Sequence, residues 1–332
     1  MSTNIQKQDN FYLDIKNLIQ SAKNRVYQTI NSVMTKTYWE IGKRIVEQEQ
    51  KGESRATYGK AILKNLSKEL TMEFGKGFSV DNLENMRRFY MAYSKSETVS
   101  RNFSLSWSHY IFLTRLESQE RDFYEIEAVE NSWSLRELKR EFNSGLYERL
   151  KLNRDTKSIK ELSKKGQVVS SIDEVIKDPY ILEFVGLPEH SSYSESELEQ
   201  RLIDKIEDFL LELGKGFTFV ARQKRITIDE KHFRVDLVFY NRFLNCFVLI
   251  DLKIGELKHQ DIGQMMMYVN YFDRYEKQRN ENKTVGIILC KDKSNALVKM
   301  TLPEDNSQIY ASKYLTVLPN KDELKRLLEE QK

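Results

Sequence analysis

The sequence predicts an α + α/β protein, with an all-helical domain of residues 1–154 followed by an α/β domain of residues 155–332. Through most of the first half, apolar residues recur at steps of three and four, which is the period of one helical face. The second half contains apolar runs with the two-residue period of strands, and a helical run follows them. The length of 332 residues also favours two domains over one.

The composition excludes several classes of protein. A net charge of +3, from 53 basic and 50 acidic residues, is too small to identify a nucleic-acid-binding protein by charge alone. The two cysteines, Cys246 and Cys290, lie in apolar runs and are expected to be buried free thiols. The N-terminus lacks a signal-peptide core, and no apolar run approaches the roughly 20 residues of a membrane helix. We therefore expect a cytoplasmic protein with no membrane association.

The first half begins with a helical pattern that extends from Phe11 to about Lys51 and fits one long helix or two helices with a bend. A second helix is predicted from Tyr58 to Phe74, and Ser79 is a good N-cap for a third. Between them lies a short glycine turn. Helix, short turn and helix is the spacing of a helix-turn-helix motif.

The third helix would present polar side chains outward, of types that read bases or hold phosphates. Because most pairs of helices joined by a turn bind no nucleic acid, an ordinary solvent-exposed face is the alternative. The candidate nucleic-acid contacts on this helix are Asn85, Arg87 and Arg88.

Further helices are predicted from Glu117 to Val129 and after Ser134, where Glu137 completes a capping box. Residues 151–195 are basic and then rich in proline and serine, which indicates a linker that contains the domain boundary near residue 155. An ordinary linker and a linker that follows a nucleic-acid backbone are both compatible with this composition.

The α/β domain is predicted to begin with a helix after Ser194 that ends at Gly214. A strand follows from Phe217 to Ile228. Within it, Gln223 and Arg225 alternate with apolar neighbours and are candidates to face an active cleft or nucleic acid.

The chain is organised around residues 232–271. Two strands are predicted there, and the first carries Asp236 between apolar neighbours. The second is an apolar run that ends with Asp251 and Lys253, which project from the same face because they are two residues apart. If the strands form a hairpin, Asp236 can approach Asp251.

Two carboxylates held together repel each other, and a divalent cation relieves this repulsion. Mg²⁺ prefers one or two carboxylates together with water and phosphate oxygens. Lys253 beside such a cation could hold a phosphate oxygen or help to deprotonate an attacking water. These residues are suited to the hydrolysis of a phosphodiester bond.

The pattern of Asp236, fourteen intervening residues and Asp251-Leu252-Lys253 resembles the PD-(D/E)xK nuclease superfamily. Val235 replaces the proline and Asp251 the glutamate of the family pattern. Gln264 and Tyr268 fit the Q-x-x-x-Y helix motif of one branch of these nucleases. The chain as a whole is similar to the YhcG-type family, which joins a helical N-terminal domain to such a nuclease domain.

This resemblance implies a restriction-endonuclease-like αβββαβ core with a mixed sheet, and a winged-helix-like N-terminal domain that binds DNA or mediates dimerisation. It implies Mg²⁺ or Mn²⁺ at Asp236 and Asp251, with Lys253 at the attacking water. Gln264 and Tyr268 would position the lysine or the backbone. Many of these enzymes also place an acid on their first helix, for which Glu199 is the candidate and Glu195 and Glu197 are competitors.

The sequence therefore predicts a metal-dependent nuclease that acts on DNA, with branched or foreign DNA as candidate substrates. Cutting both strands requires two sites, which favours a homodimer, and a protein partner in a defence or repair system is compatible with the fold. Two alternatives stay open: a non-catalytic DNA-binding or assembly protein that uses the nuclease fold as a scaffold, and a ribonuclease.

Overall fold

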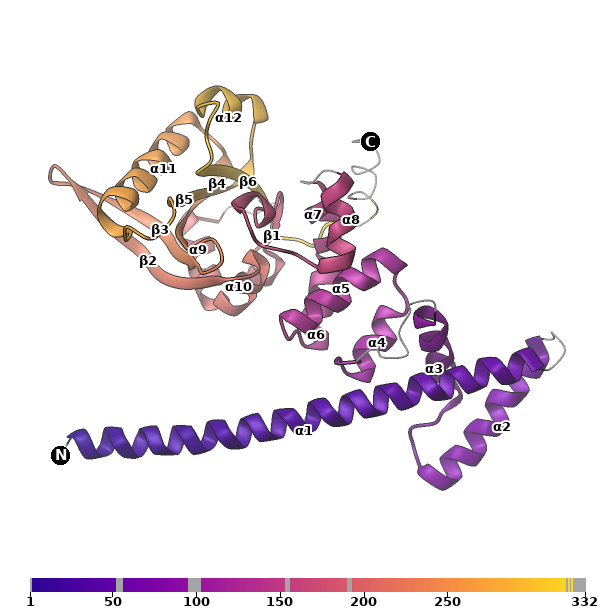
Figure 1. The fold of residues 1–332 in the computed structure, drawn as a ribbon. Coiled ribbons are helices and arrows are strands. Elements are labelled where there is room, and N and C mark those ends of the chain that lie inside the picture. Colours follow the sequence, from indigo (N-terminus) through magenta and orange to yellow (C-terminus); the bar gives the residue numbers. More distant parts are fainter. Residues whose placement is uncertain are drawn as a thin grey trace. The chain divides into compact units, whose positions relative to one another are not determined.

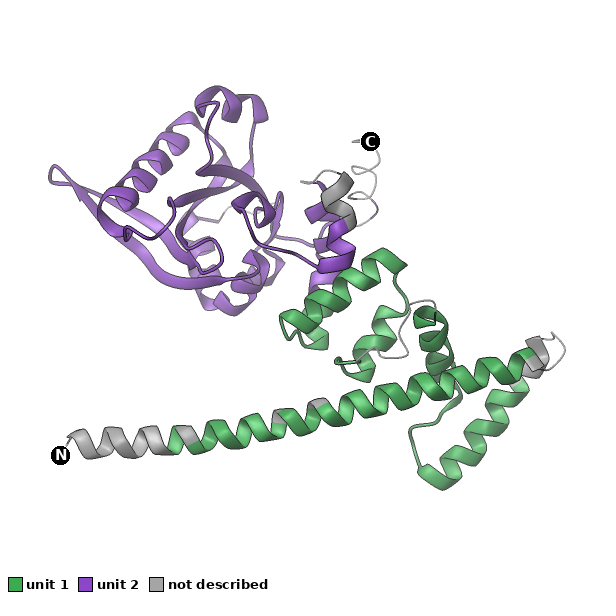
Figure 2. Cartoon of the chain, in the orientation of Figure 1, with its two compact units in different colours: residues 1–138 green, residues 139–332 purple. Residues whose placement is uncertain are grey.

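The computed structural model divides the chain into two compact units, residues 1–138 and 139–332 (Figure 2). The sequence placed the boundary later, at 154/155. No helix in the described ranges is long and apolar enough to cross a membrane. The structure describes residues 2–51, 56–94, 103–152, 156–189, 193–320, 322 and 324.

Unit 1 is helical, as the sequence predicted, and its described part contains no strand that could form the wing of a winged helix. Its first helix is continuous rather than bent (Figure 1). The helix after Ser134 crosses the division between the units. The helices are α1 (Ser2–Lys51), α2 (Ala56–Phe74), α3 (Val80–Tyr93), α4 (Trp107–Leu113), α5 (Ser118–Glu130) and α6 (Leu135–Asn143).

The predicted pair α2 and α3 packs against α1 through a small apolar core. Ile45 of α1, Leu63 of α2 and Leu83 of α3 are all buried in it. Ser79 caps α3 as expected, because its hydroxyl accepts a hydrogen bond from the backbone N–H of Asn82 at 3.3 Å.

Unit 2 is built on a six-stranded mixed sheet with the order β1-β6-β5-β4-β3-β2. The strands β2, β3 and β4 are antiparallel neighbours, whereas β5 pairs in parallel with β4 and β6, and β1 with β6. The strands are β1 (Tyr180–Ile181), β2 (Phe217–Ile228), β3 (Lys231–Asn241), β4 (Cys246–Glu256), β5 (Val285–Asp292) and β6 (Ile309–Leu315).

Helices cover both faces of this sheet, and neighbouring strand residues pack against different helices because alternate residues point to opposite faces. Leu237 and Phe239 pack in a core with residues of α9 (Glu195–Asp204) and α10 (Ile206–Leu213). Val238 packs in another core with residues of α11 (His259–Tyr271). The order α, three strands, α, strand confirms the predicted core. The helices are α7 (Leu146–Leu152), α8 (Thr156–Lys165), α9 (Glu195–Asp204), α10 (Ile206–Leu213), α11 (His259–Tyr271) and α12 (Asn295–Thr301).

Several elements differ from the expectation. The helix predicted after Ser194 is broken at Lys205 into α9 and α10, and α11 ends in a π-helical turn, η3 (Phe272–Glu276). The interpretation of residues 151–195 as a linker was wrong, because the segment contains α8, β1 and short 3-10 turns at Ile172–Glu174 and Glu183–Val185. Its apolar residues Val175 and Tyr180 are buried in the sheet core. The helix expected at residues 322–330 lies outside the described residues apart from 322 and 324.

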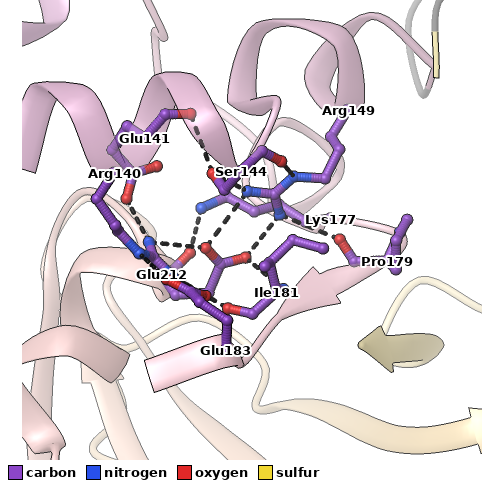
Figure 3. Close-up of polar contacts among 9 residues, drawn as sticks. All are labelled: Arg140, Glu141, Ser144, Arg149, Lys177, Pro179, Ile181, Glu183 and Glu212. Atoms are coloured by element: carbon purple, nitrogen blue, oxygen red, sulfur yellow. Dashed lines mark hydrogen bonds and ion pairs between the residues drawn. The ribbon is translucent and has the colours of Figure 1, made fainter. Parts of the chain in front are cut away.

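A buried cluster of charges fixes the start of unit 2 (Figure 3). The fully buried Arg149 donates to Glu212 Oε1 at 2.6 Å and to the carbonyl oxygen of Pro179 at 3.1 Å. Arg140 contacts Glu183 and Glu212 at 3.0 Å, and the ammonium of Lys177 donates to the carbonyl oxygen of Glu212. Residues 139–152 are therefore held to α10 by ion pairs and to Ile181 of β1 by a hydrogen bond from Arg140, which accounts for their place in unit 2.

Candidate active site

The two predicted acids lie where β3 and β4 separate. The pairing of these strands runs from Asn241 opposite Cys246 to Leu237 opposite Ile250. The next residues along are Asp236 and Asp251, and side chains opposite each other on antiparallel strands have Cβ atoms about 5 Å apart. Beyond this point β3 stays paired with β2 only, and β4 stays paired with β5. The separation opens the edge where both carboxylates lie.

Asp236 is fixed by two hydrogen bonds. Its Oδ2 accepts from the backbone N–H of Leu252 at 2.9 Å, across the gap between the separating strands. Its Oδ1 accepts from the side-chain amide of Gln223 at 3.0 Å. The carboxylate therefore has one defined orientation toward β4.

Asp251 is only 2% exposed. Burial and the neighbouring charge of Asp236 raise the pKa of Asp251 to about 7, even though Lys253 acts in the opposite direction. Lys253 Nζ lies 2.7 Å from Asp251 Oδ2, and no hydrogen-bond donor of the described residues is aligned on this oxygen. The positive charge of Lys253 is therefore too small to offset the effects of burial and of Asp236 on the ionisation of Asp251.

Lys253 is positioned by acids on two elements. Besides Asp251, Glu195 of α9 lies 3.9 Å from its ammonium. Burial acts to lower the pKa of Lys253, but Asp251, Glu195 and Asp236 outweigh it and the pKa is raised. Lys253 is therefore a protonated side chain fixed in position by acids, which suits it to stabilising negative charge rather than to accepting a proton.

Of the three acids proposed on the first helix of the domain, Glu199 is the buried one, at 4% exposed. It accepts from Arg222 Nε at 2.5 Å and from the amide of Gln223 at 2.7 Å. Glu195 is half exposed beside Lys253, and Glu197 is exposed. Glu199 therefore joins the acidic site through Gln223.

Gln264 and Tyr268 form one hydrogen-bonded unit on α11. The amide of Gln264 donates to the hydroxyl of Tyr268, and that hydroxyl donates to the carbonyl oxygen of Arg234 at 2.8 Å. Burial raises the pKa of Tyr268, and Asp251 and Asp236 add to the effect. The pair thereby anchors β3 to α11 two residues before Asp236.

The proposed nucleic-acid contacts are not gathered at this site. Gln223 points into the acidic site, and Arg225, which is exposed, contacts His232 at 2.7 Å. The residues proposed on α3 belong to unit 1. There Arg87 is bonded to Glu49 at 2.7 Å, and Arg88 is more than half exposed; Asn85 is half-buried.

Sequence reasoning missed Arg222, and for Gln223 it left open whether the side chain faces an active cleft or nucleic acid. In a regular strand Arg222 would lie on the face opposite to Gln223. The register of β2 against β3 shifts between Phe219 and Ala221, and Gln223 has a left-handed φ of 48°. These irregularities bring both side chains to Glu199, and no simple spacing signals them.

The donor set fits a small divalent cation only in part. In the described residues no group of three or more His, Cys, Asp or Glu side chains forms a ready metal site. Mg²⁺ needs only one or two carboxylates, however, because water and phosphate oxygens complete its shell. The buried Asp251 oxygen without an aligned donor, beside Asp236, meets that smaller requirement.

Comparison with known proteins also separates the chain into two parts, and the N-terminal match extends past the structural division at 138/139. The family profile of the DUF1016 N-terminal domain matches residues 14–149, and that of the YhcG PDDEXK nuclease domain matches residues 173–329. The protein "Putative nuclease YhcG" of Escherichia coli (strain K12) is 36% identical over 95% of this chain and 91% of its own length. The chain belongs to the YhcG family. The YhcG relationship confirms the predicted resemblance and makes the chain a member of a nuclease family.

Two solved structures are similar to part of this YhcG-family chain. A repair endonuclease from Pyrococcus abyssi is 21% identical with a TM-score of 0.26, over 37% of this chain and 48% of that one. EndoMS bound to double-stranded DNA is 16% identical with a TM-score of 0.27, over 40% and 50%. The chain thus spans about half of each solved chain. The fold assignment rests on the strand order and the family profiles rather than on these likenesses.

Proposed function

We propose that this chain is a divalent-metal-dependent nuclease that hydrolyses phosphodiester bonds in DNA. One observation carries the proposal. Two carboxylates, Asp236 and Asp251, lie at the separation of two strands beside the cationic Lys253, and the pKa of the buried Asp251 is raised to about 7. A site with this excess of acid is suited to a divalent cation and, through it, to a phosphate group.

The residues have separate roles in this proposal. Asp236 and Asp251 would hold Mg²⁺ or Mn²⁺, which when bound supplies Lewis-acid stabilisation of a phosphate oxygen. Lys253 orients the attacking water and stabilises the negative charge that develops on the phosphate, because its ammonium is already held in place. Gln264 and Tyr268 hold β3 against α11 at Arg234, so that Asp236 stays beside Asp251.

The surface near the acids supports a nucleic-acid substrate. The hairpin of β2 and β3 carries exposed basic residues on both strands close to Asp236. Phosphate contacts by such residues supply most of the non-specific affinity for nucleic acid. The exposed residues are Arg225, Lys231 and Arg234.

The deciding experiment is a cleavage assay with supercoiled, linear and branched DNA and with single-stranded RNA, in Mg²⁺, Mn²⁺ or EDTA. We expect metal-dependent cleavage of DNA that falls by about 10²–10³-fold in Lys253→Ala, in line with the loss of one charge-stabilising group. A matched control is Lys299→Ala, since this lysine is exposed on α12 and is assigned no contact with the substrate.

The alternatives predict different outcomes. Cleavage of RNA alone would identify a ribonuclease. Absence of any cleavage, with no calorimetric Mn²⁺ binding that depends on Asp236, would indicate a scaffold for DNA binding or assembly. Metal binding without cleavage of any substrate would indicate that a protein partner is needed.

Cleavage of both DNA strands requires two copies of this site, so we propose a homodimer for that activity. Light scattering of the full chain with and without DNA measures the copy number. A monomer under both conditions would restrict the enzyme to nicking or to single strands.

A further inference from the structure

Gln223 has a backbone conformation that is unusual inside a strand. Its φ is 48°, in the left-handed region that is sterically unfavourable for residues other than glycine. Among the described residues, the other non-glycine residues with positive φ lie in turns: Ser132, Asp229, Glu230 and Asn245. Strain of this kind in the middle of β2 requires a compensating contact.

The compensating contact is a bridge between two acids. Nε2 of Gln223 donates to Glu199 Oε2 at 2.7 Å and to Asp236 Oδ1 at 3.0 Å. A side-chain amide carries two N–H donors, so one nitrogen can satisfy both carboxylates. Glu199 on α9 and Asp236 on β3 are thereby held on either side of one neutral group.

The bridge is part of a longer line of hydrogen bonds across unit 2. On one side, Arg222 holds the second oxygen of Glu199 at 2.5 Å. On the other, the second oxygen of Asp236 accepts from Leu252 N at 2.9 Å. Four elements, α9, β2, β3 and β4, are linked in this order, and Gln223 is the link that joins the buried helix acid to the strand acid.

We propose that Gln223 is a positioning residue of the acidic site, which preorganises Asp236 for a divalent cation and ties Glu199 to the site. This inference rests on the proposed function, since the cation is the one assigned there to Asp236 and Asp251. Of the two expectations for Gln223, it takes the active cleft rather than a nucleic-acid contact. Removing a group that orients a metal ligand typically weakens metal binding by about 10–100-fold.

The first test removes the amide without adding strain. In Gln223→Gly the left-handed φ is relaxed, because glycine adopts it freely. Mn²⁺ titration by calorimetry, without nucleic acid, should give an affinity about tenfold weaker than that of the unaltered chain. Arg225→Ala, two residues along the same strand, is the matched control and should bind Mn²⁺ normally. Unchanged Mn²⁺ affinity with weaker DNA binding in Gln223→Gly would overturn the proposal in favour of a nucleic-acid contact.

The second test exchanges the neutral bridge for a charge. Gln223→Glu places a third carboxylate between Glu199 and Asp236, so the thermal midpoint in EDTA should fall through repulsion. Mn²⁺ should then raise that midpoint by more than it does in the unaltered chain. Arg225→Glu, on the exposed side of the strand, should show no such metal-dependent recovery. A Gln223→Glu protein indifferent to metal would contradict the bridge.

A double-mutant cycle separates this inference from the proposed function. In EDTA, the thermal shifts of Gln223→Gly and Glu199→Ala should be non-additive, because both remove the same contact. Additive shifts overturn the bridge whether or not the chain binds metal. A different result is non-additive shifts in a chain that binds no Mn²⁺. The proposed metal dependence would then fail, and with it the role of Gln223 in metal binding. The bridge that Gln223 makes between the two acids would still stand.

Discussion

Unit 2 contains two buried clusters of charge that are built from the same residue types and differ in their balance. The cluster of Figure 3 sets three cations, Arg140, Arg149 and Lys177, against three acids, Glu141, Glu183 and Glu212. The acidic site sets two cations, Lys253 and Arg222, against four acids, Asp236, Asp251, Glu195 and Glu199. The first is balanced and the second has an excess of acid.

Glu212 and Asp251, the central acids of the two clusters, are buried to a similar degree, but their pKa values are shifted in opposite directions. Burial alone would raise the pKa of Glu212, but Arg149, Lys177 and Arg140 outweigh it and lower the pKa to about 2. Burial and Asp236 together raise the pKa of Asp251 to about 7. A balanced cluster stabilises the fold, whereas an unbalanced one is destabilising until a cation arrives. Under the proposed function, the contrast distinguishes a structural from a functional group of charges.

The largest effect is expected from breaking the balanced cluster. Glu212→Gln leaves Arg149 and Lys177 buried without their central acid, which should cost about 3–5 kcal/mol of unfolding free energy. Urea unfolding at pH 7 measures it, with the exposed Glu207→Gln on the same helix as the control. Unfolding of Glu212→Gln at the same urea concentration as the unaltered chain would show that the cluster is not stabilising.

The acidic site should respond in the opposite direction. Because the folded-state pKa of Asp251 is raised to about 7, its contribution to stability is present below its unfolded-state pKa near 4 and is lost as the pH rises through 7. In EDTA the unfolding free energy should therefore fall over this range, by up to ~4 kcal/mol at ~1.4 kcal/mol per pKa unit.

Asp251→Asn should remove most of this fall while abolishing cleavage. Unfolding in urea at pH 5, 6, 7 and 8 measures the slope, and Mg²⁺ should reduce it in the unaltered chain because the cation favours the ionised carboxylate. The same slope in Asp251→Asn and in the unaltered chain would place the responsible group elsewhere.

The ion pairs of the balanced cluster could not be predicted from the sequence. The acids at Asp236 and Asp251 were predictable because strand periodicity and turn spacing are local signals. The pairing of Arg140 and Arg149 with Glu212 joins residues more than sixty positions apart, and no local pattern encodes it. For this reason residues 139–150 were assigned to the helical domain, and the segment 151–195, in which Val175 and Tyr180 are buried, was mistaken for a linker.

The joint contact of Arg222 and Gln223 with Glu199 was hidden for a different reason. The register shift in β2 and the left-handed φ of Gln223 change which face its side chain occupies, and a period of two assumes that neither occurs. The choice of Glu199 among three helix acids rested on the family pattern, and its burial in the structure depends on contacts with Arg222 and Gln223.

A smaller effect is expected from the hydroxyl of Tyr268, which supports the acidic site without carrying charge. Tyr268→Phe removes the bond to the carbonyl oxygen of Arg234 and should cost about 1 kcal/mol of stability. Cleavage should fall by less than in Lys253→Ala, because the ammonium of Lys253 remains beside both acids. Tyr271→Phe, whose ring packs beside Tyr275, is the control. A loss of cleavage equal to that of Lys253→Ala would make the hydroxyl a direct participant.

The smallest effects apply the same contrast to unit 1, where two arginines with different numbers of ion pairs are neighbours on α3. Arg87 is bonded to Glu49 and Glu84, and its pKa is raised by the bond to Glu49. Arg87→Ala should therefore lower stability by about 0.2–1 kcal/mol with little effect on DNA binding.

Arg88→Ala should do the reverse, because its side chain is 55% exposed and its only ion pair among the described residues is with Glu84 at 3.3 Å. If Arg88 contacts a phosphate, its loss should reduce the slope of log affinity against log salt by about one unit and leave stability unchanged. DNA-binding titrations over a range of salt concentrations measure both variants. An unchanged slope in Arg88→Ala would remove α3 from the DNA interface and leave unit 1 as an assembly domain.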